Sequence, residues 1–350
     1  MKIIVTIQHP AHVHLFRHTI DTFENRGDEV HVFVREKDIA IELLEIYDID
    51  HTILAGKSNS LGGLAMRQAQ YELNLLRHAR RIRPDVMIAM GEPSVAHVSS
   101  VLSCPGIIFT DTEYATLQNA LAFPFADRVC TPTSYQDDIG DKQVYYPGYH
   151  ELAYLHPDRF TPDPSVLHKQ GLTEEDSFAV IRLNAWNAAH FRGDAGFSDI
   201  QTVIDHIEAN GTEVLITSEP DLPENLSEYS ADVPLDRIHD LLYYADLFIG
   251  ESSTMASESA VLGTPAVFVS SSRRGYTDEL GDRYGLVYTL SGTNRQEVAL
   301  EKAVNILEEY DAKKWESRHE QLLADKIDTT EFIIDQIETA ALDESSVSSE

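Results

Sequence analysis

The feature that most limits the fold of this chain is a repeated alternation of short apolar runs with longer amphipathic stretches. In the first half, runs rich in Val, Ile and Phe are typical of strands: KIIVTI, EVHVFV, HTIL, DVMIAM, GIIF and RVCT. Helices are predicted between them, at residues 12–26, 38–47, 63–82, 94–103 and 114–122. Strands that alternate with helices form a parallel sheet with helices on both faces, so the pattern predicts a doubly wound α/β unit.

A second alternation follows a proline-rich break at residues 145–176, which is typical of a linker between domains. Beyond the break, FAVIRL, EVLITS, DLFIG, PAVFVS and LVYTL are predicted as strands separated by helices, and three helical stretches end the ordered chain. The sequence therefore predicts two Rossmann-like domains facing across a cleft. The predicted boundaries are an N-terminal domain at 1–145, a linker at 146–176, a C-terminal domain at 177–325, a helix at 326–341 and a disordered tail at 342–350.

Composition excludes several classes of protein. The chain has 58 acidic and 27 basic residues, a net charge of -31, and such a surface repels nucleic acid. Because the acids are dispersed, we expect a protein adapted to a high-salt cytoplasm. No run approaches the roughly twenty apolar residues of a transmembrane helix, and no signal-peptide pattern opens the chain, so a cytoplasmic location is predicted. Cys104 and Cys130 form no Cys-x-x-Cys pair, which argues against a disulfide framework or a structural zinc.

Two nucleotide motifs are missing from the sequence. No Gly-x-Gly-x-x-Gly follows a strand, and no Walker A lysine loop is present, so neither a nicotinamide dinucleotide nor a P-loop site is supported. We predict no bound cofactor. In doubly wound sheets ligands bind at the carboxyl ends of strands, and between two such halves the cleft is the expected site.

The stretch from Tyr243 to Ser271 carries the most specific signal. A strand, DLFIG, leads into Glu251-Ser-Ser-Thr and then a helix of small residues, which Gly263 and the following proline end. The start of this helix offers backbone N–H groups, hydroxyls and a positive dipole end, which suit a diphosphate. Glu258, one turn further on, suits a ribose diol. A plain strand-turn-helix with a serine cap is the alternative.

Histidines gather directly after the first predicted strand. His9, His12 and His14 fall within QHPAHVH, and His18 follows one helical turn later. The segment by itself is compatible with a metal site, a catalytic base or polar residues that cap a loop. Only His14 and His18 have a spacing that suits one helical face, and no Cys or clustered carboxylate accompanies them, so no metal is predicted.

Other charged residues follow predicted strands. Asp111 and Glu113 come after GIIF, and either carboxylate suits a general base or a partner for acceptor hydroxyls. Glu92 occupies a similar place after DVMIAM, and helix capping is the alternative role. Cations that suit a diphosphate also follow strands in the second half: Arg182, His190, Arg273 and Arg274. Surface ion pairs are the alternative for these residues.

The stretch at residues 243–271 resembles the donor-nucleotide motif of GT-B glycosyltransferases and of non-hydrolysing UDP-N-acetylglucosamine 2-epimerases. That resemblance implies a diphosphate at Ser252, Ser253 and Thr254 and a ribose at Glu258, with Ser-Ser standing where those families have Gly-Gly. It also implies that the loop from Arg182 through His190 supplies a cation to the donor diphosphate, and that the second half is the nucleotide-sugar domain. Arg273 is expected at the donor site because it follows a strand that ends at the mouth of the cleft.

The first half is similar to the lipid II N-acetylglucosaminyltransferases of peptidoglycan synthesis. The segments GKSNSLGGLAM and RIRPDVMIAMGE carry this likeness, and the HPAHVH start identifies the chain as a member of domain-of-unknown-function family 354, predicted glycosyltransferases. By this resemblance His12 acts as a base near the acceptor, and Asp111 or Glu113 is the alternative base. His9, His14 and Glu92 are expected on the acceptor side. Closure of the two domains would then align the substrates.

Three functions remain open on the sequence. The first is a metal-independent glycosyltransferase that moves a sugar from a UDP-sugar to a glycan or lipid-linked acceptor. The second is an epimerase-like enzyme, and the third is a sugar-nucleotide-binding protein without catalysis. A lipid-linked acceptor would place the protein at the inner face of the membrane, where the basic cluster Arg77–Arg83 suits anionic lipid, although a solvated helix end explains that cluster equally well.

Overall fold

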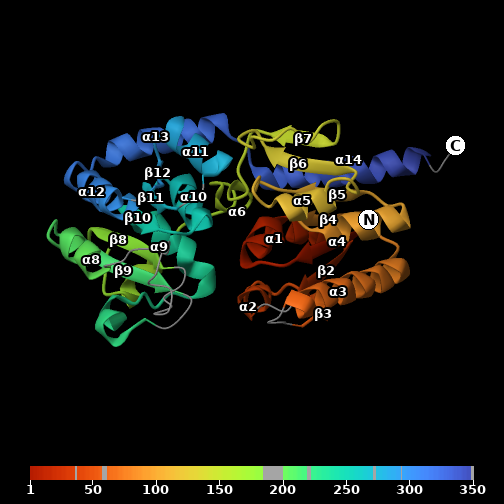
Figure 1. The fold of residues 1–350 in the computed structure, drawn as a ribbon, viewed down its shortest axis with the longest axis horizontal. Helices are drawn as coiled ribbons and strands as arrows, with labels where there is room; N and C mark the ends of the chain where they lie inside the picture. Colours follow the sequence, from red (N-terminus) through yellow and green to blue (C-terminus); the bar gives the residue numbers. More distant parts are fainter. Residues whose placement is uncertain are drawn as a thin grey trace. The chain divides into compact units, whose positions relative to one another are not determined.

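The strands of the first half of the chain form one parallel sheet, and the strands of the second half form another (Figure 1). The computed structural model describes residues 1–35, 38–56, 61–183, 200–218, 222–270, 273–292 and 294–347, with the backbone alone described at residues 38, 61–65 and 343–347. The chain divides into unit 1, which comprises Met1–Arg159 and Lys326–Glu350, and unit 2, which comprises Phe160–Asp325. The prediction of two doubly wound α/β units is confirmed.

The sheet of unit 1 has the order β3-β2-β1-β4-β5-β6-β7, and all its pairings are parallel. Its strands are β1 (Lys2–Ile7), β2 (Glu29–Arg35), β3 (His51–Ala55), β4 (Val86–Met90), β5 (Gly106–Phe109), β6 (Arg128–Pro132) and β7 (Gln143–Tyr146). The strand order reverses between β1 and β4, so the loops that follow these two strands meet at a topological switch point.

Two layers of helices cover this sheet. Helices α1 (Pro10–Asn25), α2 (Asp38–Ile46), α6 (Leu152–Leu155) and α14 (Thr329–Val347) form one layer, with α1 contacting the other three. Helices α3 (Leu61–Ile82), α4 (Pro93–Leu102) and α5 (Thr116–Ala122) form the other. Ile4, Met87, Ile108 and Val129 are buried beneath this second layer, which is why the central strands are apolar on both faces.

Unit 2 repeats the arrangement around a sheet of order β12-β11-β10-β8-β9. Its strands are β8 (Phe178–Leu183), β9 (Glu213–Ser218), β10 (Leu247–Gly250), β11 (Ala266–Val269) and β12 (Val287–Leu290). Helices α8 (Ile200–Glu208) and α12 (Arg295–Glu308) form one layer. The other contains α9 (Ile238–Tyr244), α10 (Ser253–Val261), α11 (Gly275–Asp282) and α13 (Ala312–Asp325). Shorter elements are α7 (Ser165–Lys169), η1 (Glu224–Tyr229) and η2 (Leu235–Arg237).

The segment predicted as a linker contains regular structure. Strand β7 precedes it, α6 and α7 lie inside it, and the boundary between the units falls at Arg159. The aliphatic and aromatic side chains of α6 are buried, so they belong to the core of unit 1 rather than to an exposed linker. Helix α14 also belongs to unit 1 and continues to Val347, past residue 341, where the disordered tail was predicted to begin.

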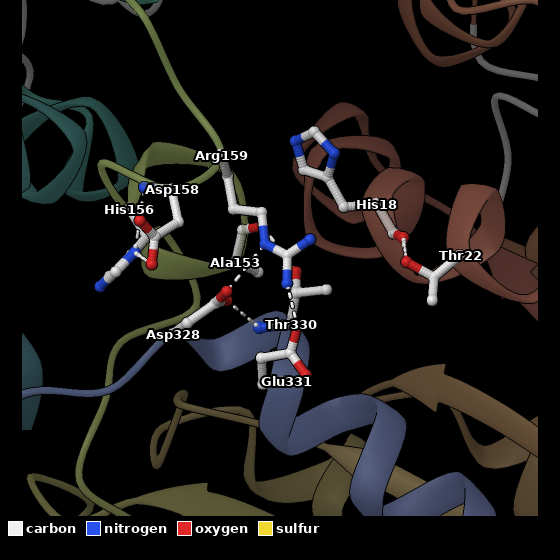
Figure 2. Close-up of polar contacts among 9 residues, drawn as sticks. All are labelled: His18, Thr22, Ala153, His156, Asp158, Arg159, Asp328, Thr330 and Glu331. Atoms are coloured by element: carbon white, nitrogen blue, oxygen red, sulfur yellow. Dashed lines mark hydrogen bonds and ion pairs between the residues drawn. The ribbon is translucent and has the colours of Figure 1, made fainter.

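The chain leaves unit 1 after Arg159 and returns to it at Lys326, and polar contacts tie the two segments together (Figure 2). The Arg159 guanidinium donates to Asp328 at 2.7 Å and also bonds to Glu331 at the start of α14. The Thr330 hydroxyl donates to the carbonyl of Ala153 at 2.7 Å. These bonds tie the start of α14 to α6 and to Arg159. Among the described residues, no helix is long and apolar enough to cross a bilayer.

Candidate functional site

In unit 2, the order of the strands brings Arg182 beside the turn that starts α10. Strands β8 and β10 are neighbours, and Arg182 is in register with Gly250, the last residue of β10. A Cβ at Gly250 would lie 2.8 Å from the Phe248 ring and 2.9 Å from Arg182 Cβ. Glycine is therefore required where the arginine crosses the strand end, and the sheet order reverses at the same point, as in nucleotide-binding α/β folds.

Helix α10 starts with an N-cap that uses one of the predicted phosphate ligands. Ser252 has an extended backbone, and its hydroxyl accepts a hydrogen bond from the backbone N–H of Met255 at 3.3 Å. The cap uses a lone pair of this hydroxyl and leaves its O–H as a donor. Ser253 and Thr254 are half-buried in the first turn, where backbone N–H groups have no acceptor within the helix. The diphosphate that we predicted here would be held mainly by these N–H groups and the helix dipole.

Glu258 is held by a histidine from another helix. His239 Nε2, on α9, lies 3.0 Å from Glu258 Oε1, and the two residues are only 2% and 4% exposed. A buried carboxylate with a fixed orientation is suited to accept hydrogen bonds from a diol. The contact depends on how α9 packs on α10, which no local pattern reveals.

The other cations predicted to face a diphosphate are placed differently. Arg273 is exposed, and its Nε donates to Asp278 at 3.0 Å, as in the surface ion pair that was the alternative. Arg274 is the N-cap residue of α11, and its guanidinium lies 5.3 Å from the centre of the Phe268 ring. His190 lies outside the described residues.

The opening histidines of unit 1 have three separate environments. His9 caps α1, and its Nδ1 accepts from the N–H of Ala11 at 3.3 Å. His12 Nδ1 accepts from the N–H of Gln8 at 3.3 Å. His14 is buried, and its ring centre lies 5.2 Å from that of Tyr154. Within the described part of the chain, no three His, Cys, Asp or Glu side chains gather as metal ligands would.

The hydrogen bond to His12 has a chemical consequence. A ring nitrogen that accepts from a backbone N–H carries a lone pair, so the proton of the neutral ring sits on Nε2. In that tautomer the Nε2 of His12 is a donor and carries no basic lone pair. That arrangement suits the binding of an oxygen ligand better than proton abstraction.

Glu92 is buried at the switch point of unit 1 rather than open to a ligand. It follows β4 and is 1% exposed, and the Thr6 hydroxyl of β1 donates to its Oε2 at 2.5 Å. Burial raises the pKa of Glu92, against the effect of its polar neighbours. A carboxyl that tends toward its neutral form here stabilises the junction of two central strands.

Asp111 forms a buried ion pair that the sequence did not predict. His150 Nδ1 lies 3.2 Å from Asp111 Oδ2, and the residues are 5% and 8% exposed. Burial alone would raise the pKa of Asp111, but the His150 charge and the hydrogen bonds from His150 and Thr112 together outweigh burial and lower it. Burial alone would lower the pKa of His150, but the Asp111 charge and hydrogen bond, with the Glu151 charge, together outweigh burial and raise it. His150 follows β7, and since that short strand was not predicted, no signal placed this histidine at the sheet edge.

Glu113 is the one predicted base with a raised pKa and partial exposure. Its Oε1 accepts from the N–H of Gln136 at 3.2 Å. Burial raises the pKa of Glu113, and the carboxylates of Asp111 and Asp137 add to the effect. A higher pKa makes an ionised carboxylate a stronger base.

Known structures share this fold over nearly the whole chain. UDP-GlcNAc 2-epimerase from Neisseria meningitidis, solved bound to UDP-GlcNAc, is 11% identical with a TM-score of 0.66, and the match covers 96% of this chain and 99% of that one. The spinosyn rhamnosyltransferase SpnG, solved with spinosyn aglycone, is 15% identical with a TM-score of 0.64, and the match covers 97% and 100% of the two chains.

These matches and the two parallel-sheet units define a protein of the GT-B fold, as predicted. Residues 1–340 match the family model described as protein of unknown function (DUF354), and the chain belongs to that family. A relative, the uncharacterized protein MJ0665 of Methanocaldococcus jannaschii, is 26% identical over 279 residues, which cover 76% of this chain and 81% of that protein.

Proposed function

We propose that this protein is a glycosyltransferase that takes a sugar from a UDP-sugar donor and transfers it to an acceptor hydroxyl. The observation that carries the proposal is the strand-end arrangement of unit 2. There Arg182, the first turn of α10 and the buried His239–Glu258 pair all belong to elements that meet at or next to one topological switch point. A cation, helix N–H groups and a fixed carboxylate match a diphosphate joined to a ribose.

Each donor contact has a chemical role. The Arg182 guanidinium and the α10 dipole stabilise the negative charge that develops on the leaving diphosphate. Glu258, oriented by His239, accepts from the ribose hydroxyls. The likeness in fold to a UDP-GlcNAc complex supports UDP as the nucleotide.

We assign the general base to Glu113 among the three predicted candidates. Asp111 is paired with His150, and its pKa is lowered, which makes it a weaker base. His12 uses the lone pair of Nδ1 to accept from Gln8. Glu113 retains a carboxylate whose pKa burial raises, and it is half exposed to an incoming hydroxyl.

An epimerase is the second candidate. The half-exposed carboxylate of Glu113 follows β5 at the sheet edge of unit 1, where it suits acid–base chemistry on the sugar of a UDP-sugar. The neighbour of known structure from Neisseria meningitidis is such an enzyme by name. The two reactions differ in their demand for an acceptor. An epimerase converts the UDP-sugar alone, whereas a transferase releases UDP only as a glycoside forms.

The first experiment is a thermal-shift titration with UDP, GDP, CDP and ADP and their common sugar conjugates, in about 2 M KCl to screen the acidic surface. A rise specific to UDP compounds is expected. Arg182→Gln should weaken UDP binding by about ten- to one-hundredfold, because a charge-assisted hydrogen bond contributes about 1.5–3 kcal/mol. Glu258→Gln should weaken the binding of UDP more than the binding of uracil, which has no ribose.

Arg283→Gln is the matched control. Arg283 also lies in unit 2, but it pairs with Asp325 at 2.7 Å on α13, away from the strand ends. If this variant weakens UDP as much as Arg182→Gln does, the donor site has been misplaced. If no nucleotide raises the melting temperature of the native protein, both enzyme proposals are wrong.

A further inference from the structure

A cleft within unit 1 lies directly beside Glu113. It has a volume of about 800 Å³ and is formed by α5, the turn that follows it and the segment between β6 and β7. All of its walls belong to unit 1. A concave site with a titratable group of raised pKa at its edge is the usual form of a binding site for a small molecule or a chain end.

The charged side chains of this cleft are almost all acidic. Besides Glu113, its wall carries Asp137, Asp138 and Asp141. The single cation, Lys142, donates from Nζ to the carbonyls of Pro124 at 2.7 Å and Phe123 at 3.4 Å, so its ammonium group is turned to the backbone. Like charges brought together across a binding surface are unfavourable. A ligand with a phosphate or carboxylate in this cleft would be repelled.

The rest of the wall is apolar or neutral. Phe123 and Tyr135 supply aromatic rings, and Asn119 supplies an amide. The Asn119 amide donates to the carbonyl of Thr112 at 3.0 Å and lies 3.4 Å from the hydroxyl of Tyr135, which fixes these groups. Sugar rings have an apolar C–H face and hydroxyl groups that donate to carboxylates, so a wall of this kind matches a sugar in both respects.

We propose that this cleft binds the acceptor, and that the acceptor is the end of a glycan without phosphate or carboxylate groups, either uncharged or carrying an amino group. This inference rests on the proposed transferase function. The acceptor hydroxyl gives its proton to the Glu113 carboxylate, and its oxygen forms the new bond to the anomeric carbon of the donor sugar. The bond from that carbon to the diphosphate oxygen breaks, and its electron pair leaves with UDP.

The test uses four disaccharides that differ only in the terminal unit: glucose, glucosamine, glucuronate or glucose 6-phosphate. Their binding to the full chain is measured by saturation-transfer NMR, and their turnover with UDP-sugars by mass spectrometry of the products. The glucose and glucosamine compounds should bind and react, and the two anionic compounds should be at least about tenfold poorer at about 0.1 M KCl. The difference should shrink in about 2 M KCl because salt screens the repulsion.

The cleft is tested by the triple variant Asp137→Asn, Asp138→Asn, Asp141→Asn, whose sites are all exposed. It should raise the binding of the glucuronate and phosphate compounds relative to the glucose compound by about tenfold. The control is Glu309→Gln, Glu316→Gln, Glu320→Gln, which removes the same charge from exposed positions of unit 2.

Three results would overturn the proposal: a preference for the anionic compounds, an equal response of the two triple variants, or no binding of any sugar to a protein that responds to UDP. Failure of nucleotide-sugar binding itself is distinct, because then UDP would give no thermal shift. If the sugars bind but UDP-GlcNAc is converted to its C2 epimer without them, the cleft is a sugar site of an epimerase and its role as an acceptor site is wrong.

Discussion

At the scale of single residues, burial raises the pKa of Glu92 and lowers the pKa of His18, so the two residues make stability depend on pH in opposite ways. Glu92 is 1% exposed, and burial raises its pKa above the usual 4.5. The folded chain thus holds this proton more tightly than the unfolded chain does. The stabilisation is complete below pH 4.5 and is lost as the pH rises through the raised pKa of the folded state.

Glu92→Gln should remove this dependence, since an amide is neutral at every pH and can still accept from Thr6. We expect the free energy of unfolding of the variant to increase relative to that of the native protein as the pH rises from 4.5 toward 8. Urea unfolding of both proteins at each pH gives the difference. A constant difference across this range would mean that Glu92 has an ordinary pKa in the folded state.

His18 should give stability the opposite dependence on pH. Burial, helped by the charges of Arg17 and Arg159, lowers its pKa from 6.5 to about 4, and Figure 2 shows the ring near the Arg159–Asp328 pair. The contribution of the neutral His18 ring to stability is fully present above pH 6.5 and is lost as the pH falls toward 4. In His18→Gln, the loss of stability between these two pH values should be smaller than in the native protein, as measured by urea unfolding. NMR titration of the ring with a midpoint near 6.5 would contradict the expectation.

At the scale of elements, α10 depends on a cap that shares its position with the proposed donor site. The Ser252 hydroxyl accepts from the N–H of Met255 at 3.3 Å, and loss of a serine cap typically costs about 1 kcal/mol. Ser252→Ala should therefore lower the free energy of unfolding of unit 2 by about that amount. Ser253→Ala, at the next position and already inside the helix, is the control and should change it by less than about 0.5 kcal/mol. Equal losses in the two variants would show that the cap contributes nothing.

The variants Ser252→Ala and Ser253→Ala also distinguish an effect on stability from an effect on UDP binding. Because we expect backbone N–H groups of the first turn to hold the diphosphate, Ser253→Ala should leave UDP affinity within about threefold. A much larger loss in this variant would assign the phosphate contact to the serine hydroxyl.

At the scale of the whole molecule, the net charge of -31 should make stability depend on salt. Repulsion among dispersed acids acts over about 30 Å at 0.01 M salt and over about 3 Å at 1 M. The melting temperature should therefore rise as KCl increases from about 0.01 M to 1 M, by about 2–4 °C for each 1 kcal/mol gained. Sucrose at equal osmolality is the control. If sucrose raises the melting temperature as much as KCl does, screening of charge is not the cause.

Much of the fold could be predicted from the sequence because the information is local. Val- and Ile-rich runs such as KIIVTI and FAVIRL are apolar on both faces, and helices lie between them, so a doubly wound parallel sheet follows from periodicity alone. Strand β7 and helix α6 were missed because each has only four residues, and the prolines around them predict a linker. The residues at strand ends were also predictable, since parallel strands present their carboxyl ends to one edge.

What the sequence by itself determined is therefore the type of fold, its two repeats and the set of polar residues that follow the strands. Only the tertiary structure decided which of these residues meet. His150 reaches Asp111 because β7 lies two strands from β5, His239 reaches Glu258 because α9 packs on α10, and Arg182 reaches Gly250 because β10 pairs with β8. The physical reason is one of range: periodicity acts within a few residues, whereas burial and charge pairing depend on strand order and helix packing, which join positions far apart in the chain.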